Sequence, residues 1–290
     1  MTAVLPLNAE ELELIRIHGL SLGQIAWRRQ KQQELRRRFP EQYPESDVDC
    51  FLASGGQRFD VDALKALAAK AQGLAPEIVP TLPRSRGRDL AVAPARLMVW
   101  SRPAVNRSYV IGADVGEGIE GRDASAACVL DRRSGEQVAE LHGWVAPDRF
   151  ALLLSGVGRW YRMAQLAVER NNHGHSTLNT LRNVCRYPRL YRHVRYDAGK
   201  KAVAILGWPT DVQTRPILID DLAAAIAGQH IGIRSAGLLD ECMSFIVTDR
   251  GDGEAAPDAH DDRVIAAGIA WQVRKRGSRQ LGGDTEEQRS

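Results

Sequence analysis

The sequence predicts an α/β protein in which a mixed sheet is flanked by helices. The first observation is the order of periodic segments after residue 107: three strand-like runs, a helix, a strand, a helix, more strand and further helices. The second is size, because 290 residues of which 44% are hydrophobic can bury the core of one large domain with an appendage, or of two small domains. The third is a helical pattern near the N-terminus, which predicts a helical segment ahead of the sheet.

The composition excludes several classes of protein. Charged residues make up 26% of the chain, so neither a fibre nor a largely disordered protein is indicated. No apolar run approaches the roughly 20 residues of a membrane helix, and the N-terminus lacks the basic and then apolar order of a signal peptide. We therefore expect a cytoplasmic protein with no membrane partner. The cysteines lie far apart without a CxxC pair, which predicts reduced thiols: Cys50, Cys128, Cys185 and Cys242.

Three segments surround the predicted sheet domain. Residues 1–72 are expected to form a helical connector: a hairpin over 8–39 with a break at Gly19 and a cap at Ser21, then a short helix over 60–72. The proline-rich stretch 73–107 shows no sustained period and predicts a linker. The sheet domain is expected over 108–276, and the polar end over 277–290 is expected to be disordered.

Within the sheet domain, periodicity predicts each element in turn. Residues 109–115, 125–131 and 137–144 are expected to form three sequential antiparallel strands, the last two joined by a hairpin turn. The remaining elements are a helix over 147–161, a strand over 165–169, a helix over 175–186, strand segments over 190–195 and 201–208, and helices over 215–227, 235–246 and 261–274.

Two of these strands end on an acid. The run YVIGADVGEG is typical of a strand that is buried on both faces and ends at Asp114, with glycines that allow close approach to the acid. Glu169 ends a second apolar run in the same way, and the loop after it is polar. The alternatives are a turn-forming Asp and a surface Glu.

Further acids open the last helix. Asp261 and Asp262 are candidates for the same site, with a simple interaction with the helix dipole as the alternative. Because adjacent helical positions are about 100° apart, we expect only one to point squarely at a shared site, and we prefer Asp262. Asp123 in GRDAS is a candidate for a further ligand, with a turn or surface role as the alternative.

Convergence of these acids would favour metal chemistry. Crowded carboxylates repel one another and raise one another's pKa, so the cluster would need a hard cation such as Mg²⁺ or Mn²⁺. Two such ions can activate water and stabilise a leaving oxygen, which is a scheme for phosphodiester hydrolysis without a protein nucleophile.

The motifs also carry a family resemblance. In order, YVIGADVGEGIEGRDASAACVLD, LAVERNNHG, GWPT and HDDRVIAAGIAW resemble the nuclease domain of the large subunit of tailed-phage terminase, which has a ribonuclease H-like fold. The upstream stretches SLGQIAWRRQKQQEL and FPEQYPESDVDCFLASGGQRFD resemble the region that joins the packaging ATPase to the nuclease in those proteins. The resemblance covers about residues 15 to 276.

The resemblance implies a metal-dependent endonuclease that cuts double-stranded phage DNA during head filling, with a portal protein, a small terminase subunit and a packaging ATPase as partners. Position by position it assigns metal-site roles to Asp114, Glu169, Asp261, Asp262 and, as an auxiliary acid, Asp123. His260 is a candidate for a hydrogen bond nearby, with a structural role as the favoured alternative. The chain has no GxxxxGK[ST] loop, so we expect no ATPase activity from it. A fragment, a split gene and a truncated prophage gene all fit that pattern.

A basic tract follows the Glu169 loop and is a candidate for contact with DNA phosphates, with a solvated face as the alternative. It is interleaved with Tyr187, Tyr191 and Tyr196, and its basic residues are Arg182, Arg186, Arg189, Arg192, Arg195, Lys200 and Lys201.

Two other functions fit the same sequence. One is a junction resolvase of the same fold, acting on branched DNA. The other is a catalytically silent module that docks on the portal or on a separate ATPase.

Overall fold

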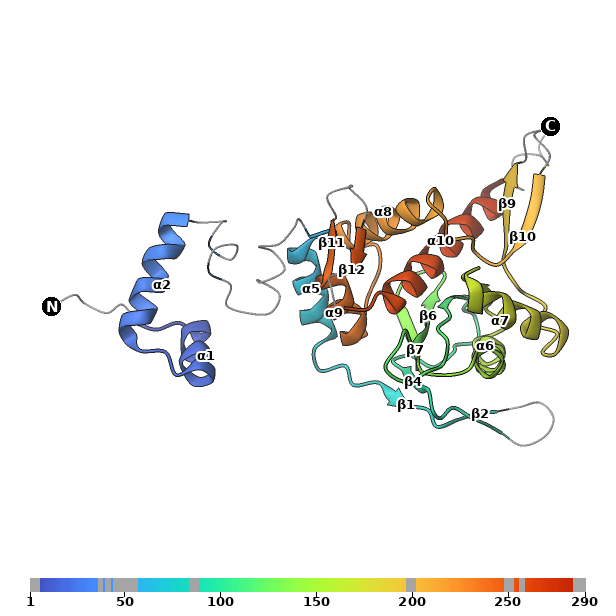
Figure 1. Cartoon of the computed structure of the whole chain (residues 1–290), viewed down its shortest axis with the longest axis horizontal. Coiled ribbons are helices and arrows are strands. Elements are labelled where there is room, and N and C mark those ends of the chain that lie inside the picture. The colour runs from blue at the N-terminus through green and yellow to red at the C-terminus, as the bar shows by residue number, and fades with distance from the viewer. Residues whose placement is uncertain are drawn as a thin grey trace. The chain divides into compact units, whose positions relative to one another are not determined.

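The computed structural model describes residues 6–35, 39, 43, 57–83, 89–196, 202–247, 253–255 and 259–283. The chain divides into two units, Met1–Gly56 and Gln57–Ser290 (Figure 1). Within the described ranges, none of the helices combines the length and the apolar character needed to cross a bilayer.

The first unit contains the predicted helical hairpin. Helix α1, Ala9–His18, begins with a capping box between Asn8 and Glu11 and ends at Gly19, whose φ of 64° suits glycine. Helix α2, Leu22–Leu35, starts where the Gln24 N–H donates to Ser21 Oγ at 3.3 Å. Salt bridges join the two helices.

The second unit is built on a six-stranded mixed sheet in the order β1-β4-β7-β6-β5-β8. The pair β5 and β8 is parallel, and the other neighbours are antiparallel. The predicted antiparallel order of three sequential strands is confirmed, and so is the predicted fold class. The strands are β1 Glu77–Ile78, β4 Arg96–Val99, β5 Tyr109–Asp114, β6 Ser125–Asp131, β7 Gln137–Gly143 and β8 Gln165–Val168.

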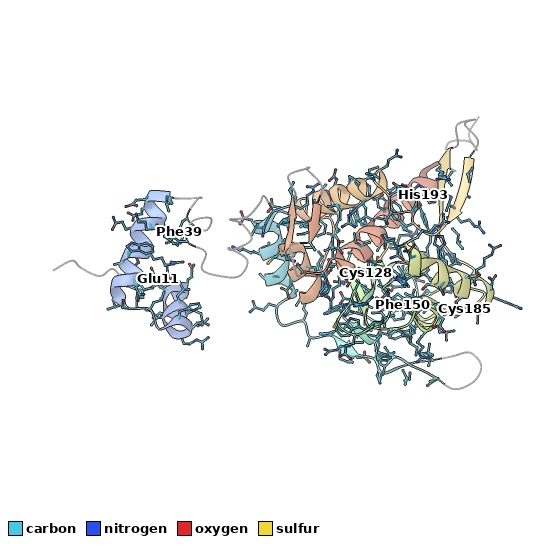
Figure 2. The ribbon with its side chains drawn as sticks, in the orientation of Figure 1. Glu11, Phe39, Cys128, Phe150, Cys185 and His193 are labelled. Atoms are coloured by element: carbon cyan, nitrogen blue, oxygen red, sulfur yellow. The ribbon has the colours of Figure 1, made fainter. Side chains whose placement is uncertain are left out.

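Helices cover both faces of this sheet (Figure 1). Alternate residues of β5 point to opposite faces, so Val110 joins one hydrophobic cluster and Ile111 the other. Cys128 of β6 and Phe150 of α6 likewise belong to opposite clusters (Figure 2). The first face is covered by α5 Val61–Ala71, α8 Thr214–Ala227, α9 Ala236–Met243 and α10 Asp262–Gly283, and the second by α6 Pro147–Trp160 and α7 Asn172–Asn183.

Glycines of β5 and the loop after it admit the protein's own backbone. A Cβ atom at Gly112 would lie 2.2 Å from the carbonyl oxygen of Ala266, because α10 crosses the sheet directly above this position. A Cβ atom at Gly116 would lie 2.1 Å from the carbonyl oxygen of Asp123. At these two positions the close approach that the sequence predicted is made by a helix and a loop of the same chain.

The segment boundaries differ from the prediction. Residues 73–107 contribute β1 and β4 to the central sheet and also form a small pair, β2 Thr81–Leu82 with β3 Leu90–Ala91. Helix α5 belongs to the second unit, where Leu64 and Leu67 pack in the core. These segments are short and irregular in pattern, and only their packing against the sheet domain identifies them as part of it.

The C-terminal half contains further differences. Phe245 was predicted to be helical but starts strand β11, Phe245–Val247, which pairs with β12, Gly253–Ala255. Strands β9, Arg192–Tyr196, and β10, Ala202–Leu206, form a hairpin apart from the six-stranded sheet. Helix α10 continues to Gly283, past the predicted start of the tail at 277, and residues 284–290 lie outside the described ranges.

Candidate active site

Two acids lie side by side at one edge of the sheet. Asp114 is the last residue of β5, and Glu169 directly follows β8, its parallel neighbour. The Glu169 N–H donates to the carbonyl oxygen of Ala113 at 2.8 Å, which fixes the register of the two acids. Since side chains alternate along a strand, Asp114 lies on the same face as Val110 and Gly112, the face that α10 covers.

The third acid comes from α10. Asp262 is the first residue of this helix and is 6% exposed, beside 8% for Asp114 and 7% for Glu169. Its Oδ2 accepts from the N–H of Ala124, just before β6, at 3.1 Å. The helix therefore brings an acid from the end of the chain to the edge where two strands deliver theirs.

Asn171 joins the two strand-end acids. Its Nδ2 donates to Glu169 Oε2 at 2.8 Å and lies 3.2 Å from Asp114 Oδ1 and from the carbonyl oxygen of Val115. Its Oδ1 accepts from Gly174 N at 2.7 Å and so caps α7. The sequence showed a polar loop here but did not identify Asn171 as a site residue; an Asn just after a strand-end acid and before a helix is the signal.

Burial makes the carboxyl groups of Asp114 and Asp262 hard to ionise. Burial, followed by the hydrogen bond and the charge of the neighbouring Glu169 carboxyl, raises the pKa of Asp114 well above its usual range. Burial also raises the pKa of Asp262 to about 6, opposed by the hydrogen bond from Ala124. A nearby cation would offset both effects.

The acids line one cavity of about 350 Å³. Asp261, adjacent to Asp262, also lines it, and its Oδ2 lies 2.7 Å from Nη2 of Arg215, a partner that the sequence did not reveal. The Asp123 side chain is 82% exposed and lies 3.8 Å from Nδ1 of His260. All five predicted acids therefore reach the cavity: Asp114, Asp123, Glu169, Asp261 and Asp262.

The acids share this cavity without forming a closed cage. Across the part of the chain that the structure describes, no three His, Cys, Asp or Glu side chains form a group that could hold a metal ion. Mg²⁺ commonly binds through one or two carboxylates and completes its shell with water and phosphate oxygens. The paired carboxylates of Asp114 and Glu169 and the separate carboxylate of Asp262 fit that mode of binding.

The basic tract runs away from this cavity along α7. Arg182 lies on α7, Arg192 on β9, and Arg186 and Arg189 between them; all four are exposed. Arg195 on β9 is exposed too, while Lys200 and Lys201 lie outside the described residues. Two tyrosines of the tract are buried, since Tyr187 is 4% and Tyr191 5% exposed. They therefore do not form an exposed surface together with the arginines between which they lie in the sequence.

The comparisons with known proteins bear on the fold. No protein-family model and no curated protein matches the sequence. The large terminase nuclease from thermophilic phage G20c with bound cobalt aligns at 18% identity and a TM-score of 0.50, over 72% of this chain and 96% of that one. The same nuclease with bound magnesium aligns at 20% identity and 0.49, over 72% and 96%. The Thermus phage P74-26 large terminase nuclease domain aligns at 18% identity and 0.48, over 72% and 93%.

The TM-score of 0.50 with the cobalt-bound nuclease shows a shared fold, and at 18% identity the similarity concerns the fold alone. It confirms the predicted resemblance at that level. The six-stranded mixed sheet with helices on both faces thus has the same fold as the large terminase nuclease from phage G20c, as the resemblance predicted.

Proposed function

We propose that this chain is a metal-dependent endonuclease that hydrolyses the phosphodiester bonds of double-stranded DNA. The observation that carries the proposal is the meeting of Asp114 and Glu169, at the ends of adjacent parallel strands, with Asp262 in one cavity. The fold supports it, since the likeness is to a terminase nuclease whose solved structures include cobalt-, magnesium- and zinc-bound forms.

We assign Asp114, Glu169 and Asp262 as ligands of two Mg²⁺ or Mn²⁺ ions, with Asp261 and Asp123 as further candidates. Carboxylate oxygens are the ligands that these hard cations prefer. When bound, such ions lower the pKa of an attacking water and stabilise the leaving oxygen. Asn171 holds the first two carboxylates together, and Arg215 keeps the Asp261 carboxylate at the wall of the cavity.

We propose that the exposed arginines of the basic tract bind the DNA backbone. From Asn172 at the cavity to Arg182, α7 rises by about 15 Å at 1.5 Å per residue. That length corresponds to roughly four base pairs, so a duplex at the acids would reach the tract. Contacts to phosphates would give binding that tolerates sequence and weakens with salt.

The fold likeness supports a place in the DNA packaging of a tailed phage, in the cytoplasm of a bacterial host. The chain would act there as the nuclease of a terminase large subunit, with a portal protein, a small terminase subunit and a packaging ATPase as partners. DNA is the substrate that the site itself supports.

The test is cleavage of supercoiled plasmid by the purified chain with Mg²⁺, Mn²⁺ or Co²⁺. We expect nicking and linearisation by the wild type and a loss of at least about 100-fold in Asp114→Asn, because that carboxylate would be a direct ligand. Isothermal titration with Mn²⁺ should show weaker binding in the same variant.

Asp148→Asn is the matched control, since Asp148 is an exposed acid in the first turn of α6 and does not line the cavity. It should cleave like the wild type. Absence of cleavage with every metal would favour the silent docking module, and a marked preference for four-way junctions would favour the resolvase.

A further inference from the structure

The first turn of α10 lacks a cap from its own N-cap residue. The Ile265 N–H donates to the carbonyl oxygen of Asp261 at 2.9 Å, which makes Asp261 the N-cap. An Asp at this position usually accepts from the N–H groups of the first turn. Here its carboxylate binds Arg215 and lines the cavity instead.

Glu241, on α9, supplies the missing cap. Its Oε2 accepts from the backbone N–H groups of Arg263 at 2.8 Å and Val264 at 3.2 Å, the two residues that follow Asp262. Free N–H groups at a helix start need such partners when they are buried, and they favour a negative charge. A residue distant in sequence thus does what the N-cap side chain does in most helices.

The same carboxylate is held by the side chain of Arg263. Nη1 of Arg263 donates to Glu241 Oε1 at 2.6 Å, and its Nε donates to Glu140 Oε1 of β7 at 3.0 Å. Both acids are buried, at 7% exposed for Glu241 and 1% for Glu140. Three elements, α9, α10 and β7, are therefore tied together at the residue next to Asp262.

We infer that Glu241 is a positioning residue that orients Asp262 toward the metal-binding cavity; the inference rests on the function proposed above. By capping the N–H groups next to Asp262, Glu241 fixes the start of α10 and with it the direction of that carboxylate. It also leaves the carboxylates of Asp261 and Asp262 available to the cavity. Glu241 does not line the cavity, so its effect on metal binding passes through Asp262.

The test replaces Glu241 by glutamine, which keeps the shape of the side chain but has a single acceptor oxygen. In the wild type, two carboxylate oxygens accept from the backbone N–H groups of Arg263 and Val264 and from the side chain of Arg263. Mn²⁺ affinity is measured from the electron paramagnetic resonance signal of free Mn²⁺, and the Mn²⁺ midpoint of plasmid cleavage is measured beside it. We expect both to weaken by about 10- to 100-fold in Glu241→Gln, as for other residues that orient metal ligands. Cleavage should recover at high Mn²⁺, which a general loss of folded protein would not allow.

Glu140→Gln is the matched control, because Glu140 contacts the same arginine but none of the backbone N–H groups of α10. Its Mn²⁺ affinity should stay within about threefold of the wild type. Equal losses in the two variants, or wild-type affinity in Glu241→Gln, would overturn the inference. A wild type that neither binds Mn²⁺ nor cuts DNA would overturn the proposed function first, and the inference with it.

Glu241→Asp provides a second variant if the glutamine variant does not fold. It keeps the negative charge beside Arg263 but withdraws the carboxylate by one methylene from the N–H groups. A folded Glu241→Asp protein with weakened Mn²⁺ binding supports the positioning role, and one with wild-type Mn²⁺ binding contradicts it.

Discussion

His142 is half-buried near the end of β7 and lines a cavity together with Arg263 and His260. Burial, followed by the charges of Arg263 and His260, lowers the pKa of His142 from 6.5 to about 4. Between these values the unfolded chain binds more protons than the folded protein at this residue. The stabilisation is therefore complete above about pH 6.5 and is lost as the pH falls toward 4.

We predict that His142→Gln reduces the acid sensitivity of the fold. A lowering of this size corresponds to at most about 3 kcal/mol, and partial exposure to water reduces it to about 1–2 kcal/mol. Urea unfolding at about pH 7 and about pH 4.5 should show a smaller fall in the free energy of unfolding for the variant. Groups common to both proteins cancel, so equal falls would show that His142 is not a source of the acid sensitivity.

At the scale of elements, helix α7 links the acids to the basic tract. Its N-terminus carries Asn171 against the carboxylates, and Arg182 lies near its C-terminus. Within the described part of the chain, Arg182 and Arg186 have no salt bridge to an acidic side chain, and both are exposed. Their charges are therefore available for phosphates.

We predict that the double variant Arg182→Gln, Arg186→Gln weakens DNA binding equally for all sequences. The plot of the logarithm of the binding constant against the logarithm of the salt concentration should become less steep. Its slope should decrease in magnitude by up to about 2, at about 0.9 per lost phosphate contact. Fluorescence anisotropy with duplexes of unrelated sequence at several salt concentrations measures this. The control is Arg133→Gln, an exposed arginine in the turn after β6, at the far end of the strand from the acids. An unchanged slope in the double variant would remove these arginines from the DNA surface.

At the scale of the whole molecule, the sheet domain needs the residues before β5. Phe59, Leu64 and Leu67 lie in the core beneath α8 and α9, and Leu97 of β4 lies in the core on the other face. Both hydrophobic clusters consist of residues from Phe59 onward. The second unit therefore contains its own core.

We predict that residues 57–290 fold without the first unit and that residues 108–290, the predicted domain start onward, do not. Each buried leucine or phenylalanine contributes about 1.5–3 kcal/mol, and several such losses exceed the 5–15 kcal/mol that stabilises a typical domain. Thermal melts followed by circular dichroism distinguish the two truncations. A cooperative melt of the shorter protein would contradict the importance of α5, β1 and β4.

The sequence by itself determined the elements with strong periods and the acids that they carry. The apolar run to Asp114 and its counterpart before Glu169 are long enough to identify strands, and a strand's last residue lies at an edge of the sheet whatever its neighbours are. The paired acids before the last helical run were visible for the same reason, and all of these acids line one cavity. Their roles as metal ligands stay predictions.

Only the tertiary structure decided which short segments belong to the domain and which polar groups meet. Two-residue strands such as β1 are too short to show a periodic pattern in the sequence. Helix α5 is assigned to the sheet domain because it packs against α8 and α9 in the core. Glu241 lies 22 residues before Arg263 and looks like an ordinary helical acid in sequence, yet folding brings it to the start of α10. Local pattern fixes how a segment folds and which residue ends it, whereas contacts between distant segments depend on the packing of the whole core.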